Sequence, residues 1–240
     1  MVSSVYSPMK PQHIALLCML VPFFAVHLTW GLSASKGWIP SCIPYLEGCT
    51  TISRAARSGE SIHLFRAMML PMATLFIFYW LQAHTWLRLI TGQSGKGVFT
   101  MRALGVVGAL FLILYATYLG TDGETYRWLR RYGVTFYFSF TALAQIFFIH
   151  SLHKQPVQVG SYGLQRILLL KTGLCVFQWG IGLISVPLDF LIETREARKM
   201  MQNIIEWNFA LAMNLFFLLT YLMYKKTRYI HTGQLKPAEN

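Results

Sequence analysis

Six apolar runs, each long enough to cross a lipid bilayer, restrict what this chain can fold into. A helix needs roughly 20 apolar residues to cross a hydrocarbon core about 30 Å thick, whereas barrel strands alternate apolar and polar residues over about 10 positions. With 55% hydrophobic and 12% charged residues, the chain is predicted to be all-α, a bundle of six transmembrane helices in a single domain over residues 1–240. The predicted spans are about 13–32, 62–90, 99–120, 131–152, 164–192 and 203–224.

The first run resembles the apolar core of a signal peptide, because it follows a short segment that contains Lys10. No small-residue cleavage site follows it cleanly, so we expect a retained helix. Small-residue stretches at 105–109 and 180–182 predict close approaches between helices.

Charge gives the predicted orientation. Six spans place both termini on one side of the membrane, where only Glu239 of the nine acidic residues falls. Lys and Arg divide almost equally between the two sides, so the positive-inside rule decides little. The side that holds the termini therefore carries almost only positive charge, which suits the anionic lipids of a cytoplasmic leaflet. We predict that both termini are cytoplasmic. The net charge of +12 is then a membrane-surface feature and predicts no nucleic-acid partner.

Cys42 and Cys49 lie in the first outer loop, within PSCIPYLEGCT. If this loop faces an oxidising compartment, a disulfide between them is expected, and the alternative is two free thiols. Cys18 and Cys175 lie within spans, where a buried thiol usually only packs.

Ionisable residues gather at the outer ends of the spans. His63 and Arg66 open the second span three residues apart, so they share one helix face. In a compact bundle such residues lie at one membrane depth, where ionisable groups usually pair and mark a site. The alternative is that they extend separately to the interface. The other residues of this set are Asp122, Arg131, Asp189 and Glu206, with Trp207 beside the last.

These residue types suggest chemistry at a lipid headgroup. His63 or Glu206 is the candidate catalytic proton acceptor. Arg66 and Arg131 are candidates to hold an anionic headgroup and to pair with Glu206. Asp122, Asp189 and Trp207 complete the expected headgroup contacts.

Other chemistries lack their sequence patterns. The chain contains no H-E-x-x-H, C-x-x-C, P-loop or G-x-S-x-G motif. No helix carries two histidines spaced to ligate stacked haems. We therefore expect neither a metal site nor a cofactor.

Two segments resemble the six-span Frag/DRAM/Sfk family. In TISRAARSGESIHLF, Ile52-Ser53 and Leu64-Phe65 stand at the spacing of the family's first-loop signature, with Glu60 beside its Pro-Glu position. The last span opens with Glu206-Trp207, similar to the family's Glu-aromatic pair. The chain departs from the pattern at Gly59, where the family has Pro, and at 130–133, where it often has His.

The resemblance implies work on lipids at the non-cytoplasmic face. The family includes proteins of glycosylphosphatidylinositol-lipid remodelling, autophagy modulators and organisers of plasma-membrane lipids. We expect a protein that acts on or organises membrane lipids, including remodelling by acyl transfer. The alternative is a non-catalytic lipid-binding or scaffolding protein, and the sequence does not decide whether it is an enzyme. The expected location is the plasma membrane or a bacterial inner membrane, with Golgi or lysosome as the alternative.

Overall fold

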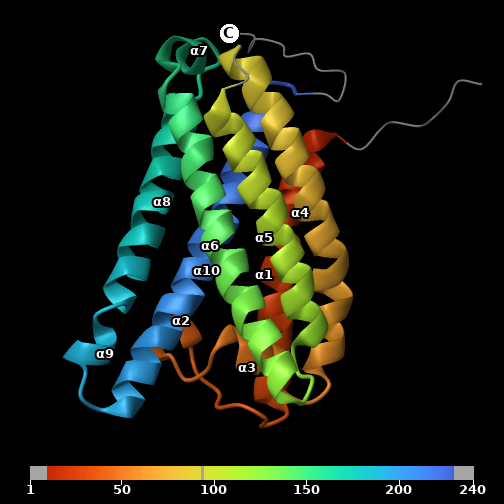
Figure 1. The fold of residues 1–240 in the computed structure, drawn as a ribbon, viewed down its shortest axis with the longest axis vertical. Helices are drawn as coiled ribbons and strands as arrows, with labels where there is room; N and C mark the ends of the chain where they lie inside the picture. The colour runs from red at the N-terminus through yellow and green to blue at the C-terminus, as the bar shows by residue number, and fades with distance from the viewer. Residues whose placement is uncertain (1–9, 93–94, 230–240) are drawn as a thin grey trace, which may run out of the picture.

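The computed structural model describes residues 10–92 and 95–229, except for the side chains of residues 188 and 189. Six helices in this part are long and apolar enough to cross a membrane, as predicted. They run in alternating directions as a bundle (Figure 1). The six are α1 (Pro11–Ser35), α4 (Ser61–Thr91), α5 (Lys96–Tyr118), α6 (Glu124–His153), α8 (Gln165–Ser185) and α10 (Arg195–Lys226).

Four short helices lie in the connections. At one end of the bundle, the loop-1 end, lie α2 (Pro44–Glu47), α3 (Ile52–Arg57) and α9 (Leu188–Leu191). At the opposite end, the α7 end, lies α7 (Pro156–Ser161).

Three of the long helices have bounds that differ from the predicted spans. The fourth helix starts at Glu124 and the sixth at Arg195, several residues before their apolar runs. Charged residues form helix as readily as apolar ones, so hydropathy locates the membrane-crossing part and not the helix end. The fifth helix ends early, at Ser185, because Pro187 has no N–H to continue the hydrogen-bond ladder.

Glycines allow three helices to approach closely. A Cβ on Gly105 would lie 2.2 Å from the Trp80 ring of α4, and one on Gly108 would lie 3.0 Å from Thr141 Oγ1 of α6. The predicted close approach at 105–109 is therefore confirmed. The prediction for 180–182 is wrong for Gly180, which has nothing within 4 Å of the Cβ position.

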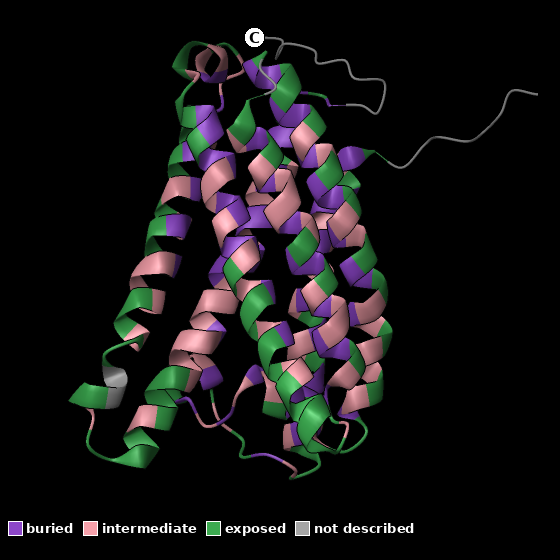
Figure 2. Ribbon diagram, in the orientation of Figure 1, coloured by how far each residue is buried: buried purple, intermediate pink, exposed green. Residues whose placement is uncertain are grey.

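The fifth transmembrane helix, α8, lies at the side of the bundle against α10 and α6 (Figure 1). Its buried residues form one stripe at helical spacing: Leu168, Lys171, Cys175 and Gln178. The rest of its surface is half-buried or exposed (Figure 2). The Lys171 ammonium donates to Thr220 Oγ1 of α10 at 2.6 Å and lies over the rings of Phe148 and Phe216. These contacts hold the α7 end of α8 against the bundle.

Candidate functional site

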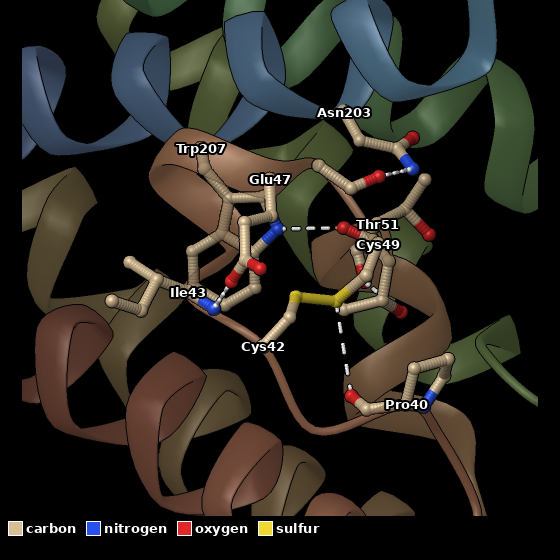
Figure 3. Close-up of a disulfide and its surroundings, with 10 residues drawn as sticks. Pro40, Cys42, Ile43, Glu47, Cys49, Thr51, Asn203 and Trp207 are labelled. Atoms are coloured by element: carbon tan, nitrogen blue, oxygen red, sulfur yellow. Dashed lines mark hydrogen bonds between the residues drawn. A yellow bond between two sulfur atoms is a disulfide. The ribbon is translucent and has the colours of Figure 1, made fainter. Parts of the chain in front are cut away.

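The first loop folds back over the start of α10, and a disulfide closes it. Cys42 and Cys49 form the predicted bond, with their Cα atoms 6.4 Å apart (Figure 3). Between them, α2 ends at Gly48, whose φ of +59° is in the left-handed region. A Cβ there would lie 2.1 Å from the Met200 carbonyl oxygen, so only glycine fits this approach to α10.

Polar side chains of α10 hold the loop by its backbone. Asn203 Nδ2 donates to the Gly48 carbonyl at 2.6 Å, and Trp207 Nε1 donates to the Thr50 carbonyl at 2.9 Å (Figure 3). Asn208 Nδ2 donates to the Tyr45 carbonyl at 3.0 Å. Trp207, predicted to contact a headgroup, is instead buried, and its indole N–H binds the protein backbone.

Glu206 caps the small helix α3. Its Oε1 accepts a hydrogen bond from the Ile52 N–H at 3.1 Å, and the Thr51 hydroxyl accepts from Arg54 N at 2.9 Å. The first N–H groups of a helix have no partner within the helix, so these two acceptors stabilise its start. A carboxyl group within the apolar run of α10 thus has a structural partner 154 residues away in the chain.

Two hollows meet at Glu206. The inner cavity, about 40 Å³, lies inside the bundle, and its wall is mostly apolar. The lateral groove, about 350 Å³, runs between α6, α8 and α10. Phe138 and Glu206 line both of them. Gly182 leaves room in the groove, because its Cβ position meets only Phe209, at 3.4 Å.

The polar groups on these walls are few and uncharged apart from Glu206. Tyr115 lines the inner cavity and shares a hydrogen bond of 2.8 Å with Ser53, on α3. Tyr137 and Asn214 also line it, and within the described residues neither side chain makes a hydrogen bond. Ser185 and Gln202 line the groove. Among the residues that the structure describes, no Lys, Arg or His lines either hollow.

An aromatic cluster lies beside the inner cavity. Tyr45 Oη and His27 Nε2 are 2.9 Å apart, and His27 Nδ1 is 2.7 Å from the Phe23 carbonyl. A carbonyl only accepts, so Nδ1 carries a proton, and Nε2 shares the second hydrogen bond with the Tyr45 hydroxyl. Burial raises the pKa of Tyr45 to about 12, which keeps this hydroxyl protonated. The Tyr45 ring packs edge-on against Trp207.

Arginines gather on the outer surface of the loop-1 end. Burial lowers the pKa of Arg57, and the nearby charges of Arg130 and Arg54 lower it further. Arg130 donates to the Thr121 carbonyl. This positive surface lies outside both hollows.

Of the predicted catalytic and headgroup residues whose side chains the structure describes, Glu206 alone lines the two hollows, and Trp207 lies beside it on α10. His63 is exposed on the first turn of α4 and lines neither hollow. Arg66 donates to the carbonyls of Ala116 and Leu119 and to the Thr121 hydroxyl. Asp122 and Arg131 are exposed, and the Asp189 side chain lies outside the described residues.

The expected ion pair with Glu206 is not present. Among the described residues, neither Arg66 nor Arg131 pairs with this carboxyl group. Arg66 reaches backbone carbonyls at the end of α5, where it stabilises a turn.

The sequence did not single out His27, Tyr115, Tyr137 or Asn214. Each lies in an apolar run where an isolated polar residue normally packs in the interior, and only the contacts between helices place them at one site. In the part of the chain that the structure describes, no three His, Cys, Asp or Glu residues gather to hold a metal ion.

Comparisons with models of protein families, with curated proteins and with solved structures found no match. The resemblance to the Frag/DRAM/Sfk family therefore remains a prediction from the two segments that suggest it.

Proposed function

We propose that this multi-pass membrane protein binds membrane lipids, with the acyl chains in the lateral groove and the headgroup at Glu206. The observation that carries the proposal is the meeting of an apolar groove and an apolar cavity at one carboxyl group. The groove lies between three helices that are apolar enough to cross a membrane, so bilayer lipid is the molecule that surrounds it. Apolar pockets with a few placed polar groups are typical of ligand sites.

The wall chemistry favours a headgroup that donates hydrogen bonds. Glu206 accepts, Asn214 both donates and accepts, and Tyr137 offers a hydroxyl. A phosphate would meet no cation in either hollow, and an uncompensated anion there would be costly. Lipids with hydroxyl, amide or amine headgroups fit this wall, whereas the arginines of the outer surface lie outside it.

The loop-1 end is proposed to face the non-cytoplasmic side, with both termini in the cytoplasm. The Cys42–Cys49 disulfide supports this orientation, because disulfides persist in oxidising compartments. The plasma membrane or a bacterial inner membrane is then the proposed location, with Golgi or lysosome as the alternative.

Lipid remodelling by acyl transfer is the catalytic form of the same proposal. Glu206 would take a proton from a hydroxyl of the bound lipid as that oxygen attacks the ester carbonyl of a second lipid, and would return the proton to the alcohol that leaves when the ester bond breaks. His63 would take no part, since it lies outside the hollows. Binding without catalysis requires only the hollows and Glu206, and we propose it as the primary function.

Two matched pairs of variants test lipid binding. Gly182→Leu fills the groove, whereas Gly180→Leu places the same side chain where nothing lies within 4 Å. Glu206→Gln keeps an acceptor for the Ile52 N–H but removes the carboxyl group. Glu196→Gln is its control, because it replaces an exposed carboxyl group at the start of α10. The measurement is the amount of native lipid retained per protein after purification in detergent, by mass spectrometry.

The proposal expects less retained lipid in Gly182→Leu and Glu206→Gln, and wild-type amounts in the two controls. Equal retention in all four folded variants would contradict it. The catalytic form predicts that the amount of one lipid species changes in cells that lack the protein. Wild type should restore that amount, and Glu206→Gln should not.

A further inference from the structure

A further hollow with a different chemistry lies at the α7 end, where α5 begins and α6 ends. This basic pocket is about 200 Å³ in volume. Its wall carries Lys96, the first residue of α5, together with His150 and Lys154 at the end of α6. Gln155 adds an amide group, whereas the hydroxyls of Thr91 and Ser151, also on the wall, donate to backbone carbonyls of their own helices.

Among the described residues, no acidic side chain offsets the charges of this pocket. No described Asp or Glu lines it, and neither Lys96 nor Lys154 pairs with a described carboxylate. Two lysines on one wall attract an anion. The described walls of the inner cavity and lateral groove have the opposite character, with the Glu206 carboxyl group and no cation.

We propose that the basic pocket binds a phosphate group through Lys96 and Lys154, with His150 and Gln155 as further donors. Lysine binds phosphate as a point charge with three donors, and the Gln155 amide and a His150 ring N–H complete the hydrogen bonds. The phosphate comes from an anionic lipid headgroup or from free phosphate in solution. This proposal does not depend on the site at Glu206, because the two sites share no residue.

Two double variants test the phosphate proposal. One removes two cations from the basic pocket, and the other removes two cations from elsewhere at the α7 end. The pocket variant is Lys96→Gln with Lys154→Gln. The control is Arg166→Gln with Lys225→Gln, two exposed cations that do not line the pocket. Both variants change the net charge equally, and all four side chains are exposed, so both should fold. Thermal unfolding verifies this.

The measurement is the affinity of full-length protein in uncharged detergent for phosphatidic acid, phosphatidylcholine and inorganic phosphate. Phosphatidic acid should bind wild type and control more tightly than phosphatidylcholine, and the pocket variant should lose about tenfold in affinity. If the pocket variant instead loses binding of inorganic phosphate alone, free phosphate is the ligand. Equal affinities in the two double variants for both phosphate probes would overturn the proposal.

Discussion

At the scale of single residues, Glu206 connects two elements that are far apart in the chain. It accepts from the first N–H of α3 and at the same time lines both hollows. The residue therefore has a stabilising role in addition to its proposed role toward a lipid, and variants must separate the two.

Glu206→Ala should lower the free energy of unfolding by about 1 kcal/mol, because it leaves the Ile52 N–H without its acceptor. Glu206→Gln should lose less than half of that, since the amide oxygen accepts the same hydrogen bond. Denaturant titration of the purified protein measures both, with Glu196→Ala as the exposed control. Equal losses for Ala and Gln would show that the cap contributes little.

Gly48 tests how tightly the first loop contacts α10. Gly48→Ala combines a positive φ with a Cβ at 2.1 Å from the Met200 carbonyl oxygen, and should cost about 2–4 kcal/mol. Gly37→Ala is the matched control, because Gly37 has a φ of +68° but nothing within 4 Å. It should cost only about 1 kcal/mol. Similar melting temperatures for the two variants would rule out the close contact.

At the scale of elements, the first loop and α8 form the two sides of the site. Four hydrogen bonds attach the loop to α10, three donated by Asn203, Trp207 and Asn208 and one accepted by Glu206. The Cys42–Cys49 disulfide closes the loop on itself. α8 is held at the α7 end by Lys171, and at the other end the lateral groove separates it from its neighbours.

The disulfide predicts the redox environment of the first loop. In intact cells, a membrane-impermeant maleimide should label Cys42 and Cys49 only after an impermeant reductant has been added. Cys18 and Cys175 are buried and should not react. Labelling of the two loop cysteines without reductant would mean free thiols, and labelling only after membrane permeabilisation would reverse the proposed orientation.

Lys171 tests what holds α8 in place. Lys171→Ala removes the bond to Thr220 and leaves a hole between Phe148 and Phe216, and should cost about 2–4 kcal/mol. Lys171→Met keeps the volume without the charge and should stay within about 1 kcal/mol of wild type. Unfolding in SDS measures both, and Leu170→Ala on the exposed face is the control. A Met variant as unstable as Ala would show that the ammonium itself is required.

At the scale of the whole molecule, the sequence predicted the architecture better than the site. Six apolar runs led to the six long helices, because the length of a membrane-crossing helix is set by the bilayer. Helix ends such as Glu124 and Arg195 lay outside these runs, where hydropathy carries no information about helix formation.

The site was predicted only where one residue was unusual in its own run. Glu206 stands out because a carboxyl group in an apolar helix is rare. Tyr137 and Asn214 do not stand out in their apolar runs. Tyr137 lines the same cavity as Glu206 because of how α6 and α10 are rotated against each other, and Asn214 lies on α10 itself. The prediction of Arg66 as a partner was wrong for a related reason, since exposed backbone carbonyls compete for arginine and cannot be read from sequence.

The central claim is that lipid occupies the lateral groove with its headgroup at Glu206. Its most direct test is photocrosslinking in vesicles with a diacylglycerol that carries a diazirine on one acyl chain, followed by peptide mapping. We predict crosslinks on groove-lining residues such as Phe138, Ile205 and Phe209, which Gly182→Leu abolishes and Gly180→Leu leaves unchanged. Crosslinks spread evenly over the lipid-facing surface, with the same yield in both variants, would contradict the account.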